Sequence, residues 1–463
     1  MPYTSSFSFS INIGIRHMPK FRVLIKSPIR KNILANFYGI GVNLLNQIIL
    51  VPLYIVYWGN DLYSDWIIIS ALTVIFSMSD IGLNSVIQNR FSMKYSGGDI
   101  EECKSLLANN ILIVTAIFAI ALLLTLSYML SFNIVETMGL HSLERSEANV
   151  MFLLLICRVF LGMYSGIENA VYRASHRASR AVYMDQTCTL CTVVITIACL
   201  CLHIKMVYMC FSLCIPYIIL LIIKKSDARK YFPHKISIAD INMKLLKALF
   251  VPSVSFMSFP LGNAIVLQGY TLVVNKYFGT DCVVLFNTTR TMCNFIKTFL
   301  STIQNSVWPE YSIAYGNSDY RRMRNLHRKT LHVTIFCIIV ICSLLLIFGP
   351  LLYRIWTHGE VDFQYPLMCA FLVVLFFEMI WTSSGVTLMS TNNHVRLGLV
   401  YVSGAVISII TGIILSKYCP NIVWLEYTVL IMQCSLVVYT IRESLRLTKD
   451  KLCNLMKPYG NAL

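Results

Sequence analysis

Long apolar segments alternate with short polar ones along almost the whole chain. A helix that spans a bilayer needs about 20 predominantly apolar residues, and each run is close to that length. The pattern therefore predicts an all-α integral membrane protein with about twelve transmembrane helices. The predicted spans are 32–58, 64–86, 106–132, 150–172, 182–202, 206–223, 248–274, 283–307, 331–352, 365–388, 397–415 and 422–441.

Composition narrows the possible function classes. Hydrophobic residues make up 57% of the 463 residues and charged residues 13%, which is far from the balance of a soluble enzyme. The longest predicted outer loop, 133–148, is short, and the chain has no GxxxxGK[ST] or HExxH motif. We therefore expect a transporter rather than an enzyme, with no cofactor, no catalytic residue and no metal site. The 16 cysteines lie mostly inside apolar runs, which favours reduced, buried thiols.

The positive charge follows the predicted topology. The chain has 38 Lys and Arg against 22 Asp and Glu, a net charge of +16. With the N-terminus inside, 30 of the 38 basic residues fall on inner segments and five on outer ones, as the positive-inside rule requires. Both termini are therefore predicted to be cytoplasmic. Because the charge is spread over all inner loops, nucleic-acid binding is not expected.

The two halves of the chain share a repeat. Tyr95 and Asp99 match Tyr315 and Asp319 at an offset of 220, and Gly59 matches Gly279 at the same offset. This offset carries each helix onto the one six later, which predicts two pseudo-symmetric six-helix bundles around a central cavity. The predicted organisation is a basic tail, an N-terminal lobe, a linker, a C-terminal lobe and a second tail: 1–31, 32–223, 224–247, 248–441 and 442–463.

Polar residues gather on one face of three predicted helices. At 100° per residue each set falls within about 100°, which is typical of a surface that lines a cavity or contacts another helix. The first two stripes contain Asn32, Asn36, Asn43, Asn46 and Gln47, then Ser77, Asp80 and Asn84. The third, in 283–307, contains Asn287, Arg290, Asn294, Lys297 and Ser301.

Three cations lie within predicted spans, and an unpaired one near the bilayer centre is costly. Arg158, Arg290 and Lys297 are therefore expected to face a cavity as substrate-binding groups. One deep acid, Glu378, is a possible coupling residue or a pairing partner for Arg158. With three cations and one clear deep acid, the excess positive charge favours an anionic substrate. The alternative is that these residues form structural pairs between helices.

Short motifs add a family resemblance. Residues 57–66 (YWGNDLYSDW), 79–84 (SDIGLN) and 308–312 (WPEYS) resemble O-antigen flippases, the Wzx-type transporters of the multidrug/oligosaccharidyl-lipid/polysaccharide exporter superfamily. The resemblance implies transport of undecaprenyl-diphosphate-linked oligosaccharide units across the bacterial inner membrane by alternating access. It further implies that Arg158, Arg290 and Lys297 hold the diphosphate or acidic sugars. The partners it implies are membrane lipid, the lipid-linked oligosaccharide, an O-antigen polymerase and a chain-length regulator.

Two other functions remain open. An ion-coupled exporter of small amphiphiles or drugs would have the same fold, although the 32–58 helix lacks the acid that drug exporters of this superfamily often carry there. A membrane glycan polymerase would need a larger outer domain. The glycan, the coupling ion and the oligomeric state are not determined by the sequence.

Overall fold

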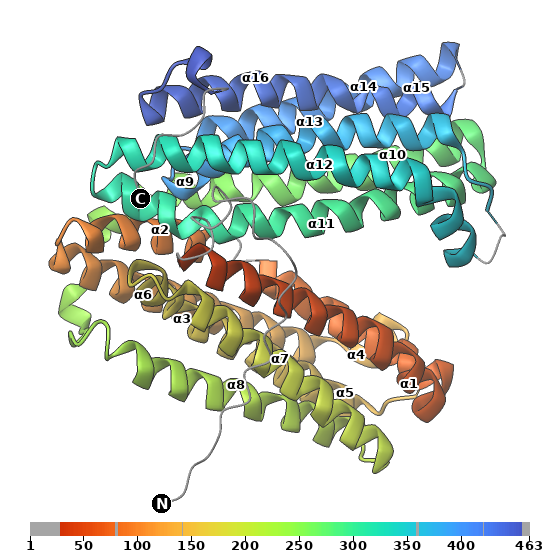
Figure 1. Ribbon diagram of the computed structural model, residues 1–463. Helices are drawn as coiled ribbons and strands as arrows, with labels where there is room; N and C mark the ends of the chain where they lie inside the picture. Colours follow the sequence, from red (N-terminus) through yellow and green to blue (C-terminus); the bar gives the residue numbers. More distant parts are fainter. Residues whose placement is uncertain (1–27, 79–81, 141, 358–360, 420, 456–463) are drawn as a thin grey trace, which may run out of the picture.

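A computed structural model describes residues 28–78, 82–140, 142–357, 361–419 and 421–455. Most of the predicted basic tail, and Asp80, lie outside the described residues. The first half of the chain forms helices that are closely packed and run mostly along one direction (Figure 1). They are α1 (Pro28–Met78), α2 (Leu83–Ser96), α3 (Ile100–Ser131), α4 (Ile134–Met138), α5 (Arg145–Ile167), α6 (Asn169–Ala174), α7 (Ala178–Cys201) and α8 (Met206–Ala228).

The second half repeats this arrangement. Two short 3₁₀ turns, Ile238–Asp240 and Leu452–Asn454, lie before its first helix and after its last. The helices are α9 (Met243–Phe256), α10 (Ser258–Phe278), α11 (Thr280–Gly316), α12 (Tyr320–Trp356), α13 (Tyr365–Ser390), α14 (Val395–Tyr418), α15 (Ile422–Tyr427) and α16 (Val429–Thr448).

The helix count agrees with an integral membrane protein of about twelve crossings. In the described part of the chain, nine helical segments are long and apolar enough to span a bilayer. The other three predicted spans fall on α11 and on the two limbs of α1, which are long enough to cross a bilayer. The limbs of α1 meet at Gly59, where the backbone leaves the helical region, and Trp66 packs on Tyr54 and Trp58 from across this break. The predicted all-α membrane fold is confirmed.

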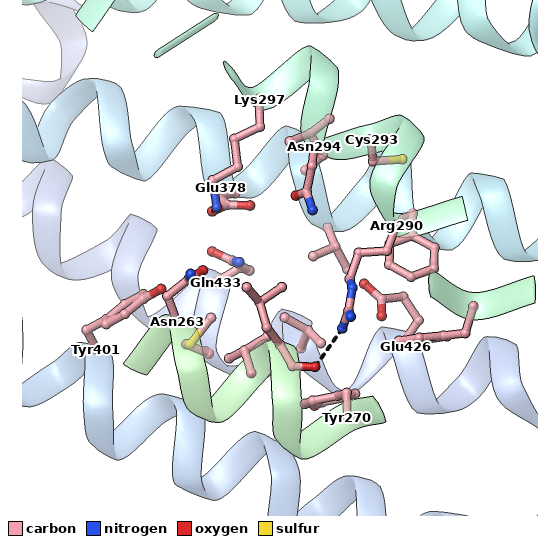
Figure 2. Close-up of a pocket in the computed structure, with 18 residues that line it drawn as sticks. Asn263, Tyr270, Arg290, Cys293, Asn294, Lys297, Glu378, Tyr401, Glu426 and Gln433 are labelled. Atoms are coloured by element: carbon pink, nitrogen blue, oxygen red, sulfur yellow. Dashed lines mark hydrogen bonds and ion pairs between the residues drawn. The ribbon is translucent and has the colours of Figure 1, made fainter. Parts of the chain in front are cut away.

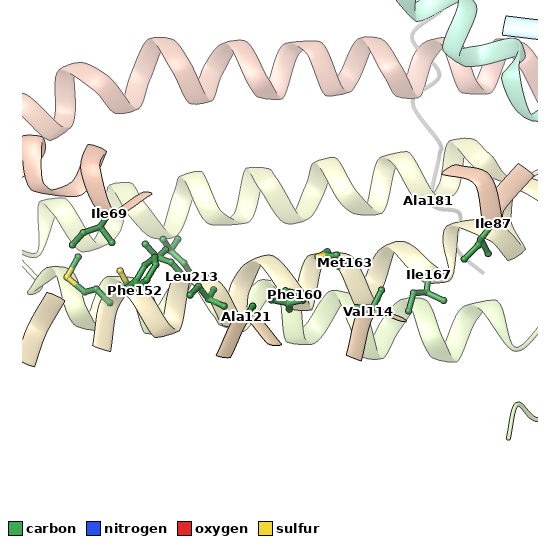
Figure 3. Close-up of a cluster of buried hydrophobic side chains, with 14 of the residues drawn as sticks. Ile69, Ile87, Val114, Ala121, Phe152, Phe160, Met163, Ile167, Ala181 and Leu213 are labelled. Carbon is green, nitrogen blue, oxygen red and sulfur yellow. The ribbon is translucent and has the colours of Figure 1, made fainter. Parts of the chain in front are cut away.

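Each half has its own hydrophobic core. One cluster of buried side chains extends from Leu50 to Phe256 and the other from Tyr270 to Leu436. Figure 3 shows the first cluster, in which Phe160 and Met163 of α5 lie between neighbouring helices. Large side chains on the outer faces remain exposed, for example Leu130 at 85%, because hydrocarbon rather than protein is their expected surrounding. The fold therefore consists of two bundles, α1–α8 and α10–α16.

The sequence repeat corresponds to a repeat in backbone geometry. Gly59 has φ 71° and ψ −179°, and Gly279 has φ 85° and ψ 174°. Asp99 and Asp319 cap α3 and α12 with nearly identical backbone angles, and each carboxylate accepts a hydrogen bond from the backbone N–H three residues later. Matching turns at an offset of 220 show that the two bundles are pseudo-symmetric.

Gly59 and Gly279 are expected to be the most sensitive turn positions. Their backbone conformation is essentially restricted to glycine, so Gly59→Ala or Gly279→Ala should lower the free energy of unfolding by about 1–3 kcal/mol. No atom would clash with the added Cβ at either position, so the cost is purely conformational. Gly41→Ala is the matched control, since Gly41 is helical and equally open. Unfolding of the purified variants in detergent measures the difference; equal stability of all three would contradict it.

The connection between the halves is more ordered than a linker. Helix α8 continues to Ala228, so Lys224 is part of a membrane helix and is completely buried. Helix α9 contacts α2 and α3, and its residues Leu245 and Leu249 join the core of the first bundle. Helix α9, the first part of the predicted seventh crossing, therefore packs the second half of the chain against the first bundle.

Candidate functional site

A small cavity of about 70 Å³ lies inside the second bundle. All its lining residues come from α10, α11, α13, α14, α15 and α16 (Figure 2). It has room for a few water molecules. Four charged side chains line it together: Arg290, Lys297, Glu378 and Glu426.

Lys297 and Glu378 form an ion pair across this cavity. The ammonium of Lys297 on α11 lies 2.5 Å from a carboxylate oxygen of Glu378 on α13, and Figure 2 shows the two side chains pointing at each other. The Glu378 side chain is 14% exposed and that of Lys297 34%. Because both side chains are partly exposed, water or a ligand can reach them and replace either partner of the pair while the helices stay packed.

Arg290 is held by neutral oxygens on the other side of the cavity. Its guanidinium donates to the carbonyl of Leu267 at 2.7 Å and to the hydroxyl of Thr271 at 3.1 Å, and it also donates to Asn287. The carboxylate of Glu426 lies in the same cavity and is buried. Glu426 is not among the site residues predicted from the sequence. The feature that could have identified it is an acidic residue only a few positions inside the apolar run 422–441.

The cavity has as many acidic as basic side chains. Two cations and two acidic groups line it, so basic groups are not in excess here. Glu378 is the one deep acid indicated by the sequence, and Glu426 is a second. These two acids offset the positive charge that favoured an anionic substrate at Arg290 and Lys297.

Arg158 lies elsewhere, in the first bundle. Its guanidinium is 5.6 Å from the ring centre of Tyr217, and no described carboxylate forms an ion pair with it. The sequence alternative that paired Arg158 with Glu378 is wrong, because Glu378 pairs with Lys297. The three predicted cations are therefore not brought together in one site.

A second ion pair lies in the first bundle and joins a buried ammonium to a partly exposed carboxylate. The ammonium of Lys224 lies 2.5 Å from the carboxylate of Asp185 and donates to the amide oxygen of Asn169 at 2.8 Å. The sequence analysis placed Lys224 in the linker, because basic residues at the end of an apolar run normally mark its exit from the membrane.

The first amide stripe begins at a contact between the bundles. Asn32 donates to the backbone carbonyl of Ser306, and Asn36 donates to its hydroxyl, both at 3.1 Å. Phe37 of α1 packs on Phe299 of α11. Asn43, two turns beyond Asn36 on the same face, is exposed, and Asn46 is half-buried. The side chains of Gln47 and Ser77 and all of Asp80 are outside the described residues.

The remaining stripe residues lie within the bundles. Asn84 is buried and accepts from Asn110 at 2.6 Å. Asn287 binds Arg290, Asn294 lines the small cavity, and Ser301 donates to the carbonyl of Thr298. Arg290, Asn294 and Lys297 of the third stripe therefore line the small cavity of the second bundle, and Asn294 is also exposed.

A polar network joins the bundles at the end that carries the Lys- and Arg-rich loops, here called the basic end. Asn89 donates to the carbonyl of Met389 at 2.8 Å and to Asn392 at 2.9 Å, and accepts from the indole of Trp308 at 2.8 Å. Asn392 in turn donates to the carbonyl of Val86. In Figure 1 the bundles lie together where α2 and α9 are labelled and separate toward the opposite side.

Gly316 makes a close backbone approach between the bundles near this network. An added Cβ would lie 2.2 Å from the carbonyl oxygen of Met93 in the other bundle, so Gly316→Ala must push the bundles apart. We expect backbone amides of α2 to exchange hydrogen at least about tenfold faster, as in a local opening favoured by about 1.4 kcal/mol. Gly97→Ala is the matched control, since its nearest atoms lie at 3.6 Å. Equal rates of amide hydrogen exchange in Gly316→Ala and Gly97→Ala would contradict the expected separation of the bundles.

Two pseudo-repeated helical bundles in contact at one end define a secondary-transporter architecture. No protein-family model and no curated protein matches the chain. Among solved structures it is similar to a MATE transporter in complex with MaL6, with 13% identity, a TM-score of 0.72 and coverage of 93% of this chain and 100% of the other. It is also similar to the Vibrio cholerae MATE transporter VcmN in the bent form, with 14% identity, a TM-score of 0.71 and coverage of 91% and 96%.

A third similar structure is the outward-facing conformation of a multidrug resistance MATE family transporter of the MOP superfamily. It has 12% identity, a TM-score of 0.68 and coverage of 94% of this chain and 100% of the other. These neighbours are transporters rather than enzymes. The chain therefore has the MATE-like transporter fold.

Proposed function

We propose that this protein is a membrane exporter that works by alternating access. The observation that carries the proposal is the contact between two separately packed bundles at the basic end, through hydrogen bonds such as Asn89 to Met389. The two large cores are separate, so rocking of the bundles would break the polar and apolar contacts between them and leave each core packed. With the basic end in the cytoplasm, this conformation is closed inward.

For the substrate, we propose an undecaprenyl-diphosphate-linked O-antigen repeat unit. Support comes from the sequence resemblance, from the exposed amide of Asn43 beyond the interbundle contact, and from Arg158, which is free of a described carboxylate partner. Amide groups suit the hydroxyls of a glycan, and a guanidinium suits a diphosphate. In this proposal the protein lies in the bacterial inner membrane with both termini in the cytoplasm, beside an O-antigen polymerase and a chain-length regulator.

Export of small amphiphiles or drugs is the second candidate, and the solved neighbours favour it at least as well. One of them is a multidrug resistance transporter. The small cavity at Arg290, Lys297, Glu378 and Glu426 also suits ion coupling, in which a carboxylate exchanges its ammonium partner for a proton or a metal cation.

A deletion strain separates the two candidates. Accumulation of complete undecaprenyl-linked repeat units together with loss of long surface chains would support the flippase. Normal surface chains, in a strain without a second flippase, together with increased sensitivity to cationic dyes would support drug export. Re-expression of the intact gene is the control, and restoration of the lost phenotype is required for either conclusion.

A further inference from the structure

A larger cavity, of about 470 Å³, opens at the basic end of the second bundle. It lies where α11, α13 and α16 end and where α12 and α14 begin, so it borders the polar edge of five membrane helices. The side chains that matter here are Tyr315, Tyr320, Arg396, Tyr439, Arg446 and Lys449. This cavity is separate from the small one that holds Lys297 and Glu378.

The cavity combines positive charge with aromatic rings. Arg396, Arg446 and Lys449 line it against a single carboxylate, Glu443, which lies 3.8 Å from Arg446. The ammonium of Lys449 lies 3.9 Å from the centre of the Tyr320 ring. All three cations are exposed, so each keeps free hydrogen-bond donors for a ligand. A net excess of two positive charges remains.

We propose that this cavity binds an anionic headgroup, one whose phosphate charge is not neutralised by a choline, at the cytoplasmic face of the membrane. Basic pockets between membrane helices on this face suit anionic lipid headgroups, and tyrosine rings suit the interface at that depth. Arg supplies paired donors for phosphate oxygens, and the Lys449 ammonium adds a point charge. A soluble phosphate compound has the same chemistry, so the experiment distinguishes the two sources.

The cavity is connected to the interbundle network through Asn392. Asn392 lines the cavity, accepts from Asn89 and donates to the carbonyl of Val86. A bound headgroup that holds Asn392 in place stabilises the contact between the bundles, and therefore favours the conformation closed at the basic end. The site thereby regulates the opening of the bundles, whatever substrate the protein carries.

The first bundle offers an internal contrast. A cavity of about 490 Å³ at its basic end is lined by Asp99, Glu101 and Glu102 against Arg90 and Lys244. Lys94 pairs with Asp99 and Glu102, and Arg90 also pairs with Glu102. Three carboxylates against two cations line it, so this cavity lacks the positive excess of the cavity at the basic end of the second bundle.

The test uses the full-length protein in detergent, with dioctanoyl phosphatidylglycerol, dioctanoyl phosphatidylcholine and inorganic phosphate as probes and native mass spectrometry as the readout. We expect phosphatidylglycerol to bind more tightly than phosphatidylcholine. Arg396→Gln, Arg446→Gln and Lys449→Gln should each weaken binding about fivefold. Arg442→Gln is the matched control, since Arg442 is an exposed cation on α16 that does not line the cavity.

The binding measurements identify the source of the ligand and test the site. Binding of phosphatidylglycerol alone identifies a lipid source, whereas binding of inorganic phosphate that competes with it identifies a soluble one; both support the site if the three variants weaken binding. Equal affinity for phosphatidylglycerol and phosphatidylcholine with no phosphate binding would overturn the proposal. Unchanged affinity in all three variants, or an equal loss of affinity in Arg442→Gln, would also overturn it. Slower hydrogen exchange of α2 on binding is expected in the wild type and not in Asn392→Ala.

Discussion

Asp185→Ala is expected to lower the free energy of unfolding by about 3 kcal/mol, the lower end of the cost of leaving a buried charge without its partner, because Asp185 itself is 34% exposed. The side chain of Lys224 is 0% exposed, and its ammonium is held by Asp185 at 2.5 Å and by Asn169 at 2.8 Å. Without the carboxylate, the ammonium must either stay charged among apolar helices or lose its proton. Thermal and denaturant unfolding in detergent measure the loss.

Two further variants make this prediction specific. Lys224→Met combined with Asp185→Asn removes both charges at similar volume, so it should recover most of the stability. Lys225→Met is the control, because Lys225 is the exposed neighbour of Lys224 on the same helix, and it should change the stability by less than about 0.5 kcal/mol. If Asp185→Ala is as stable as Lys225→Met, the pair does not hold α7 to α8.

The second large effect is expected at Lys297 and Glu378, where stability and transport should respond differently. Lys297→Met and Glu378→Gln each break the 2.5 Å pair, and each should reduce transport about tenfold to a hundredfold, the equivalent of one charge-assisted hydrogen bond. The double variant contains no unpaired charge, so it should unfold like the wild type. It should nevertheless remain defective in transport, because neither charge is left to bind substrate or a coupling ion.

Restored transport in the double variant would show instead that the pair only holds α11 to α13. Lys276→Met is the control, since Lys276 is an exposed cation on the adjacent helix α10 and should leave both measurements unchanged. Transport is measured as surface polysaccharide for a flippase and as dye efflux for a drug exporter, with expression level matched in each case.

Much of the architecture follows from the order of residues alone. The twelve crossings depend on the length of apolar runs, because each run must satisfy its own backbone hydrogen bonds in lipid. The repeat is also detectable in the sequence, because the turns at Gly59 and Gly279 have backbone conformations that only glycine adopts easily, so glycine occurs at both positions. The flanking Asp99 and Asp319 are likewise recognisable as helix caps. These features are local, so the identity and spacing of residues are sufficient to predict them.

The sequence does not predict which side chains on different helices contact each other. The amide and cation stripe at 283–307 is a genuine face of α11, but its rotation toward α10, α13 and α15 depends on how all these helices pack. Glu378 is recognisable in the sequence as a deep acid, yet it pairs with Lys297 rather than with Arg158. Glu426, which the sequence did not single out, is the second acid in the same cavity. Residue order is sufficient to predict which segments cross the membrane and which helix faces are polar. Which charges pair is set by helix packing, because an ion pair depends on distances of a few ångströms between helices far apart in the chain.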